Sequence, residues 1–196
     1  MRLGILGGTF DPPHLGHTEL ALFTLNEKNL DKIIFVPAFH APYPQKSAST
    51  SFDHRFTMTE IAVQKHPQFE VSGVEGERGG NSYTIDTIRH FKKEYRLSSG
   101  EIFLIVGADS FKRFEEWKDP KALLKECSVC VLKRIGVTSE KFDRGYVESV
   151  ELLDNELIET SSSELRERIA SGADLTKYLD DKVIEYIDQN RLYGSG

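Results

Sequence analysis

The sequence predicts an α/β fold built on an open parallel sheet that carries helices on both faces. Continuous apolar runs of strand length, most clearly 32–37 and 102–106, are typical of strands buried on both faces of a parallel sheet. Segments with helical spacing separate these runs, and strands that alternate with helices indicate βαβ units. The chain has 196 residues, which fits one domain. We expect a core over 1–158 and a small helical C-terminal subregion over 159–196.

The expected elements follow one another in a regular order. Apolar runs or alternation mark the strands, and apolar residues three and four positions apart mark the helices. In the first half we expect a strand at 2–6, a helix at 18–25, a strand at 32–37, a long loop at 38–51, a helix at 52–65, a strand at 69–74, a turn-like stretch at 75–82 and a helix at 83–95. In the second half we expect strands at 102–106, 128–132 and 147–153 and helices at 121–125, 162–171 and 181–190, with 138–145 unassigned.

Composition and charge narrow the class of protein. The formal net charge of −6 gives no sign of nucleic-acid binding, although a small polyanionic substrate depends only on local charge. No apolar run approaches membrane-spanning length, and the chain begins on a predicted strand rather than on a signal peptide or an anchor. We therefore expect a cytoplasmic protein that binds neither nucleic acid nor membrane. The sequence leaves open whether identical subunits assemble.

The two cysteines, Cys127 and Cys130, form one C-x-x-C pair. A thioredoxin-type pair opens a helix, whereas this pair runs into a β-branched segment of strand character. A zinc ribbon would need a second pair. We therefore expect two inert, partly buried thiols.

The stretch Gly7–His17, which reads GGTFDPPHLGH, lies between the first predicted strand and the first predicted helix. Its two glycines permit a tight turn with bare backbone N–H groups at a helix N-terminus, where an anion binds. His14 and His17 are three residues apart, so they lie on one face of the incoming helix. Either feature alone is ambiguous, because a Gly-Gly turn is often only a turn and His-x-x-His can be half of a zinc site. Their joint occurrence with Asp-Pro favours phosphate binding.

Two candidate positions follow the strongest predicted strand, and ligands of doubly wound sheets bind beyond the carboxyl ends of strands. Asp109, in Gly107-Ala108-Asp109, can accept hydrogen bonds from ribose hydroxyls, with a helix N-cap as the alternative. Trp117 can stack on a flat heteroaromatic ring, with a partly buried core position as the alternative.

Two predicted helix starts are further candidates. Ser161 and Glu164 fit a capping box, and the hydroxyls and N–H groups there can hold phosphate oxygens together with Arg166. A plain capped surface helix is the alternative. The N–H groups of Tyr83 and Thr84 open another predicted helix and can receive a carboxylate, although spacing alone favours ordinary capping.

The segment Gly8–Pro12 followed by His14–His17 resembles the (T/H)-x-G-H signature of the nucleotidyltransferases built on a Rossmann-like sheet. The ordered set Ser-Tyr-Thr-Ile-Asp-Thr, Gly-Ala-Asp, tryptophan and Ser-Ser-Ser-x-Leu-Arg is similar to that of bacterial nicotinate mononucleotide adenylyltransferases. The similarity runs from Met1 to about Arg168 and extends loosely to a Leu-Tyr ending. It implies transfer of AMP from ATP to nicotinate mononucleotide, which yields deamido-NAD and pyrophosphate. It also implies Mg²⁺ with the ATP, and no metal ligands are assigned to the protein.

The resemblance assigns roles to single residues. It implies catalysis by charge stabilisation at His14, His17, Lys46 and Arg166. It implies ATP contacts at Gly8, Thr9, Phe10, His14, His17, Gly107, Asp109, Ser162 and Arg166. It implies acceptor contacts at Thr9, Lys46, Tyr83, Thr84, Trp117 and Arg134.

Departures and rival functions accompany the resemblance. The loop reads Tyr43-Pro44-Gln45-Lys46 where the family usually has Pro-Pro-His-Lys, and Asn81 replaces a usual proline. A phosphopantetheine adenylyltransferase shares the first signature but is usually shorter and lacks the tyrosine-threonine and tryptophan positions. A cytidylyltransferase carries a different arginine-bearing motif late in the chain. A non-catalytic nucleotide sensor would not need to keep the histidine pair.

Overall fold

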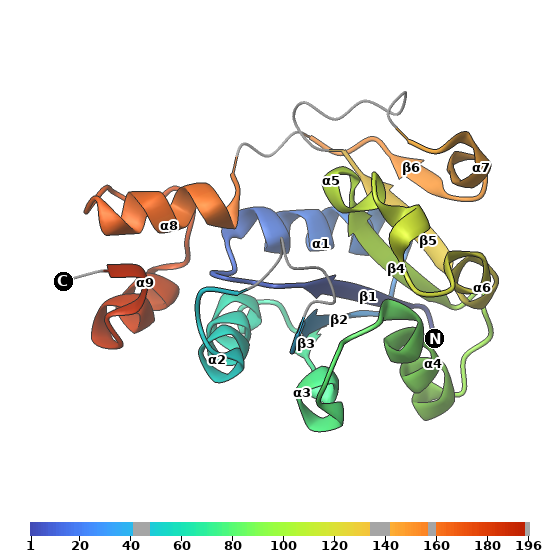
Figure 1. The fold of residues 1–196 in the computed structure, drawn as a ribbon, viewed down its shortest axis with the longest axis horizontal. Coiled ribbons are helices and arrows are strands. Elements are labelled where there is room, and N and C mark those ends of the chain that lie inside the picture. Colours follow the sequence, from blue (N-terminus) through green and yellow to red (C-terminus); the bar gives the residue numbers. More distant parts are fainter. Residues whose placement is uncertain (41–47, 134–141, 157–159, 195–196) are drawn as a thin grey trace.

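The computed structural model describes residues 1–40, 48–133, 142–156 and 160–194. Within these ranges, six parallel strands form one sheet in the order β3-β2-β1-β4-β5-β6. The strands are β1 (Leu3–Gly8), β2 (Lys32–Pro37), β3 (Phe69–Val71), β4 (Ile102–Gly107), β5 (Ser128–Leu132) and β6 (Glu151–Leu153). This is the strand order of a Rossmann-like doubly wound sheet, so the predicted fold class is confirmed (Figure 1).

Helices flank the sheet and also gather at one end of it (Figure 1). The longer helices are α1 (Leu15–Glu27), α2 (Phe52–Val63), α4 (Thr84–Tyr95), α6 (Pro120–Glu126), α8 (Ser162–Ala170) and α9 (Asp181–Gln189). The short ones are α3 (Val74–Arg78), α5 (Ala108–Phe111), α7 (Arg144–Val147) and the 3₁₀ turns η2 (Phe114–Glu116) and η4 (Leu192–Gly194). In the described ranges, no helix combines the length and apolar character needed to cross a membrane.

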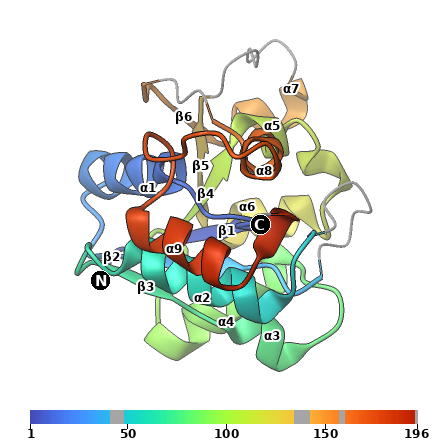
Figure 2. The same cartoon turned by 90° about the vertical axis from the view of Figure 1, so that its left-hand side faces the viewer.

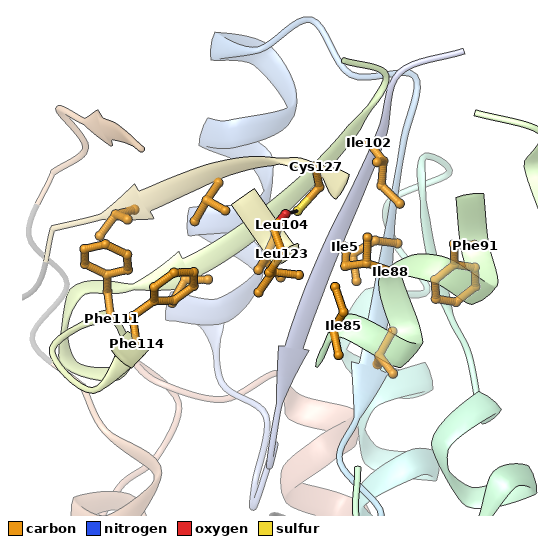
Figure 3. Close-up of a cluster of buried hydrophobic side chains, with 14 of the residues drawn as sticks. Ile5, Ile85, Ile88, Phe91, Ile102, Leu104, Phe111, Phe114, Leu123 and Cys127 are labelled. Atoms are coloured by element: carbon orange, nitrogen blue, oxygen red, sulfur yellow. Dashed lines mark hydrogen bonds between the residues drawn. The ribbon is translucent and has the colours of Figure 1, made fainter. Parts of the chain in front are cut away.

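Alternating side chains of the strands feed two apolar layers. On one face Ile5 and Leu104 pack with Ile85 and Ile88 of α4 and with Leu123 of α6 (Figure 3). The other face includes Leu6 of β1 and Leu20 and Leu25 of α1, together with residues from β2, β4 and β5. Since successive strand residues point to opposite faces, continuous apolar runs are what a sheet covered on both faces requires. Full burial of each such aliphatic side chain stabilises the fold by about 1.5–3 kcal/mol.

A third apolar cluster joins the C-terminal helices to α2. Met58 of α2 packs with Leu165 of α8 and with Val183 and Ile187 of α9. Figure 2 turns this end of the molecule toward the viewer, with α8 and α9 in front of the sheet. The chain's last helices therefore lie at the carboxyl ends of β1 and β2, close to the Gly7–His17 loop.

Several expected element bounds were wrong. The stretch 75–82 was expected to be turn-like because of its glycines, but Val74–Arg78 form helix α3. Gly76 serves close packing there, since a Cβ at this position would lie 2.5 Å from Cε1 of Phe52. Helix α1 begins at Leu15, three residues earlier than expected. The last strand is shorter than 147–153, because Val147 ends helix α7.

The two cysteines are more buried than expected. Cys127 and Cys130 are 4% and 0% exposed, and both are free thiols. Sγ of Cys127 donates to the carbonyl of Leu123 at 3.4 Å (Figure 3). Burial raises the pKa of each thiol to about 12. Since the thiolate is the reactive form, this environment agrees with inert core residues.

Candidate active site

A cavity opens where the strand order reverses, at the carboxyl ends of β1 and β4. Its wall includes Gly8 and Thr9 at the end of β1 and Gly107 and Asp109 at the end of β4. The opposite wall includes Tyr83, Thr84, Thr87, Trp117 and Lys118. Ligands of doubly wound sheets bind at this switch point. The structure thus brings seven of the fourteen predicted site residues to one cavity, whereas Phe10, His14, His17, Ser162 and Arg166 are not among the residues that line it.

The Gly7–His17 loop leaves β1 through a tight turn. Phe10 has a φ of 51°, which is the left-handed region, and its side chain is 2% exposed. A Cβ at Gly8 would lie 2.9 Å from Cζ of the Phe10 ring. Glycine at this position therefore lets the phenyl ring fold back under the turn. The ring then packs edge-on against His17, with 5.0 Å between ring centroids.

Three side chains from distant helices hold the carbonyl groups of this loop. Nη1 of Arg55 donates to the Thr9 carbonyl at 2.7 Å, and Nη1 of Arg166 donates to the Asp11 carbonyl at 2.8 Å. Oγ of Ser162 donates to the Pro12 carbonyl at 2.9 Å. Arg166 and Ser162 were predicted to contact ATP phosphate. The structure shows both residues hydrogen-bonded to the loop backbone, and their contact with ATP stays a prediction.

The Asp11 carboxylate is the most heavily hydrogen-bonded side chain of the loop. It accepts from the N–H of Ser49 at 2.6 Å, from Oγ of Ser49 at 2.8 Å, from Oγ1 of Thr50 at 2.6 Å and from the hydroxyl of Tyr193 at 2.7 Å. Burial alone would raise the pKa of this carboxyl, but the hydrogen bonds outweigh burial and hold its pKa below the ordinary value. Asp11 is 2% exposed, so it links the loop to the start of α2 and to the end of the chain.

Arg55 is the buried cation of the loop region. The residue is 1% exposed, and burial lowers the pKa of its guanidinium while the Asp11 charge opposes that shift. Neither Asp11 nor Arg55 was among the predicted site residues. Asp11 lies inside the recognised motif, and this position could have marked it as a site residue. Arg55 had no such signal, because an arginine in an amphipathic helix is typical of an exposed face.

His14 and His17 open helix α1 as a stacked pair. His14 is the N-cap, and its N–H donates to Nδ1 of His17 at 3.1 Å. The two rings lie 3.7 Å apart between centroids, which confirms that they share one face. Since Nδ1 of His17 accepts a hydrogen bond, the ring proton of neutral His17 is on Nε2. That nitrogen is then a donor suited to a phosphate oxygen.

The far wall of the cavity is built around the start of α4. Tyr83 is the N-cap without a side-chain capping hydrogen bond, and Thr84 is the first helical residue. Nζ of Lys118 lies 4.5 Å from the centre of the Tyr83 ring and donates to the Asp86 carboxylate at 2.9 Å. The first N–H groups of this helix therefore stand at the cavity wall beside an ordered aromatic ring.

The structure bears on the alternatives that the sequence left open for Trp117 and Asp109. Trp117 packs against Phe114, with 5.3 Å between ring centroids, and also lines the cavity. Its side chain is thus half-buried and also borders the cavity, where a ligand could contact it. Asp109 lies in the first turn of α5, whose N-cap is Gly107, so Asp109 is not the N-cap. The predicted residues Lys46 and Arg134 lie outside the described residues.

Comparison with known proteins places this geometry in a family. A family model described as cytidylyltransferase-like matches residues 5–168. A protein of Thermoanaerobacter sp. named probable nicotinate-nucleotide adenylyltransferase is 39% identical, and the match covers 98% of this chain and 94% of the relative. The same name is given to a Clostridium tetani protein that is 34% identical, with 98% of each chain covered. The chain belongs to the nicotinate-nucleotide adenylyltransferase family.

Solved structures agree with this family at the level of fold. A Plasmodium falciparum nicotinic acid mononucleotide adenylyltransferase complexed with NaAD superposes with a TM-score of 0.77. The match covers 100% of this chain and 98% of that one, at 21% sequence identity. Membership of the nicotinate-nucleotide adenylyltransferase family confirms the resemblance predicted from the motifs, and it decides against the phosphopantetheine-specific rival.

Proposed function

We propose that this protein transfers AMP from ATP to nicotinate mononucleotide, with deamido-NAD and pyrophosphate as products. One observation carries the proposal beyond family membership: a single cavity joins Gly7, Gly8 and Thr9, which begin the GGTFDPPHLGH loop at the end of β1, to the start of α4 and Trp117. A triphosphate-binding turn and an aromatic pocket with helix N–H groups therefore face the same space. That juxtaposition suits two nucleotides that must react with each other.

The reaction needs little covalent help from the protein. The phosphate of the acceptor is the nucleophile, and it is already ionised near neutral pH because its second pKa is about 6. It attacks the α-phosphorus of ATP, the bond from that phosphorus to the bridging oxygen breaks, and pyrophosphate leaves. No general base is required, so catalysis consists of positioning two anions and stabilising the charge that develops.

The loop and the histidine pair are suited to this stabilisation. The Nε2–H of His17 can donate to a phosphate oxygen, and His14 fixes His17 through the 3.1 Å hydrogen bond. The backbone of Gly8, Thr9 and Phe10 forms the turn between the two substrates. Arg166 adds positive charge where its guanidinium contacts the loop. Because the loop is held by protein groups before substrate arrives, little reorganisation is needed during the reaction.

The remaining residues suit recognition of the two nucleosides. Gly107 and Asp109 at the end of β4 are placed for the ATP ribose, and Ser162 stands beside the loop for the distal phosphate. Tyr83 and Trp117 offer aromatic faces to the pyridine ring. The N–H group of Thr84, at the positive end of α4, is a donor for the nicotinate carboxylate. Lys46 and Arg134 are proposed to bind acceptor phosphate.

Nucleotidyltransferases generally use a divalent metal with ATP, and we propose Mg²⁺ for this protein. The described residues contain no group of three or more His, Cys, Asp or Glu side chains that could hold a metal ion. Mg²⁺ keeps several waters and binds readily through substrate phosphates. We propose that the cation arrives on ATP as part of the substrate, where it neutralises phosphate charge.

The deciding experiment measures pyrophosphate release with ATP and each of three acceptors: nicotinate mononucleotide, nicotinamide mononucleotide and phosphopantetheine. We expect the highest kcat/KM with nicotinate mononucleotide. A higher value with phosphopantetheine would replace the proposal by that rival activity. ATP binding without turnover of any acceptor would make the protein a nucleotide sensor instead.

A further inference from the structure

The acceptor side of the cavity contains a buried carboxylate that the mechanism above does not use. Glu75 of α3 lines the cavity together with Tyr83 and Thr84, and the residue is 7% exposed. Its Oε1 accepts a hydrogen bond from Oγ1 of Thr87 at 2.8 Å. Thr87 belongs to the first turn and a half of α4 and is 2% exposed. Glu75 therefore anchors the start of α4, where the acceptor is proposed to bind.

Arg78 completes this network from the C-terminal end of α3. Its Nη2 donates to Oγ1 of Thr87 at 3.0 Å and lies 3.9 Å from Oε1 of Glu75. The Arg78 side chain is 32% exposed and that of Glu75 is 9% exposed. A carboxylate and a guanidinium thus meet at one hydroxyl, and the positive charge lies on the solvent side of the negative one.

Other charges around the cavity have different partners. The buried Arg55 is attracted by Glu75 at longer range, but it donates hydrogen bonds to backbone carbonyls, among them that of Thr9. Lys118 is paired with Asp86 at 2.9 Å. Arg78, by contrast, directs its contacts at Glu75 and Thr87.

The charge of Glu75 bears directly on which acceptor is favoured. Nicotinate carries a carboxylate on its pyridine ring, whereas the amide analogue is neutral at that position. An uncompensated carboxylate in the cavity wall repels the acid form and not the amide, and this repulsion is strong where water is excluded. We propose that Arg78 neutralises Glu75 and thereby sets the preference for the acid over the amide acceptor. This inference rests on the proposed function.

The proposal gives opposite signs for two single variants. We measure the ratio of kcat/KM for nicotinate mononucleotide to kcat/KM for nicotinamide mononucleotide. Arg78→Gln exposes the Glu75 charge and lowers this ratio by about tenfold, equivalent to about 1.4 kcal/mol. Glu75→Gln leaves the arginine unopposed and raises the ratio. The double variant Glu75→Gln/Arg78→Gln carries neither charge and returns the ratio to within about threefold of the wild-type value.

A merely structural role would give a different result. Loosening of α4 lowers kcat/KM for both acceptors together and leaves their ratio unchanged. Arg89→Gln is the matched control. Arg89 lies on α4 but does not line the cavity, and it pairs with Glu126 at 3.3 Å. We expect this control to leave the ratio unchanged.

The outcomes separate this inference from the proposed function. A wild-type enzyme that uses neither pyridine mononucleotide overturns both. Wild-type turnover combined with an Arg78→Gln ratio within about twofold of wild type overturns the charge compensation alone. If Arg78→Gln does not fold, Glu75→Gln carries the test, and an unchanged or lowered ratio in that variant overturns the inference.

Discussion

Replacing Tyr193 with phenylalanine removes a hydroxyl that bonds to the Gly7–His17 loop and keeps the ring that packs on α8 and α9. That hydroxyl donates to Oδ1 of Asp11 at 2.7 Å, and Asp11 is almost fully buried. A hydrogen bond to a charged group contributes about 1.5–3 kcal/mol to stability. Asp11 keeps its bonds from Ser49 and Thr50 in the variant. We therefore expect a loss at the lower end of this range, about 1.5–2 kcal/mol in the free energy of unfolding.

Urea unfolding followed by the fluorescence of Trp117, the single tryptophan, measures this loss as a lower midpoint at unchanged slope. Tyr186→Phe is the matched control: the Tyr186 hydroxyl lies 2.9 Å from Nδ1 of His54, and its loss should cost about 1 kcal/mol or less. On an Asp11→Asn background the Tyr193 substitution should cost less than in the wild type. A Tyr193→Phe protein within about 0.5 kcal/mol of wild type would refute the reasoning, because surface substitutions without special contacts fall in that range.

Three further predictions concern His17, the stability of the fold at low pH, and the two thiols. His17→Ala should lower kcat about a hundredfold, because one preorganised donor is lost, while KM for ATP changes little. His90→Ala, at an exposed position, is the control. Near-normal turnover of the His17→Ala protein would contradict a role of His17 in charge stabilisation. The pKa of Asp11 is lowered by its hydrogen bonds, so its ionised form stabilises the fold above the unfolded-state pKa of about 3.9, and this stability is lost as pH falls through the lower folded value. Urea midpoints should therefore fall more steeply below about pH 4 in the wild type than in Asp11→Asn, and parallel curves would exclude the effect. Cys127 and Cys130 should react with iodoacetamide only after unfolding, because burial holds the pKa of each thiol near 12; rapid labelling of native protein would show that the core opens.

The sequence predicted the central strands well because their signal is local. Strands β2 and β5 have the expected bounds, since a short continuous apolar run is the local signal of a parallel strand that is buried on both faces. Helix α3 was missed because its cause is tertiary. Gly76 looks like a turn former in the sequence, but in the fold it makes room for the Phe52 ring.

The site was predicted to the extent that its chemistry lies within single motifs. His14 and His17 share a helix face as their spacing required, and the separate stretches around Thr84, Asp109 and Trp117 meet at one cavity. The supporting groups escaped prediction because their partners are remote in sequence. Arg55 bonds a carbonyl 46 positions away, and Tyr193 bonds a carboxylate 182 positions away. Rules based on the spacing of residues within one helix or strand cannot predict contacts between residues so far apart in the sequence.

The supporting groups explain how an acidic motif is compatible with the proposed triphosphate site. Asp11 alone would place a negative charge next to the phosphates, and a buried carboxylate without partners would be costly. Hydrogen-bond donors from Ser49, Thr50 and Tyr193 turn toward that carboxylate, and the buried Arg55 offsets its charge from behind. The Asp11 side chain is thereby used to tie segments together rather than to face the substrate. Because Arg166 donates to the Asp11 carbonyl, the residue whose carboxylate brings a negative charge to the loop also holds a positive charge there through its backbone.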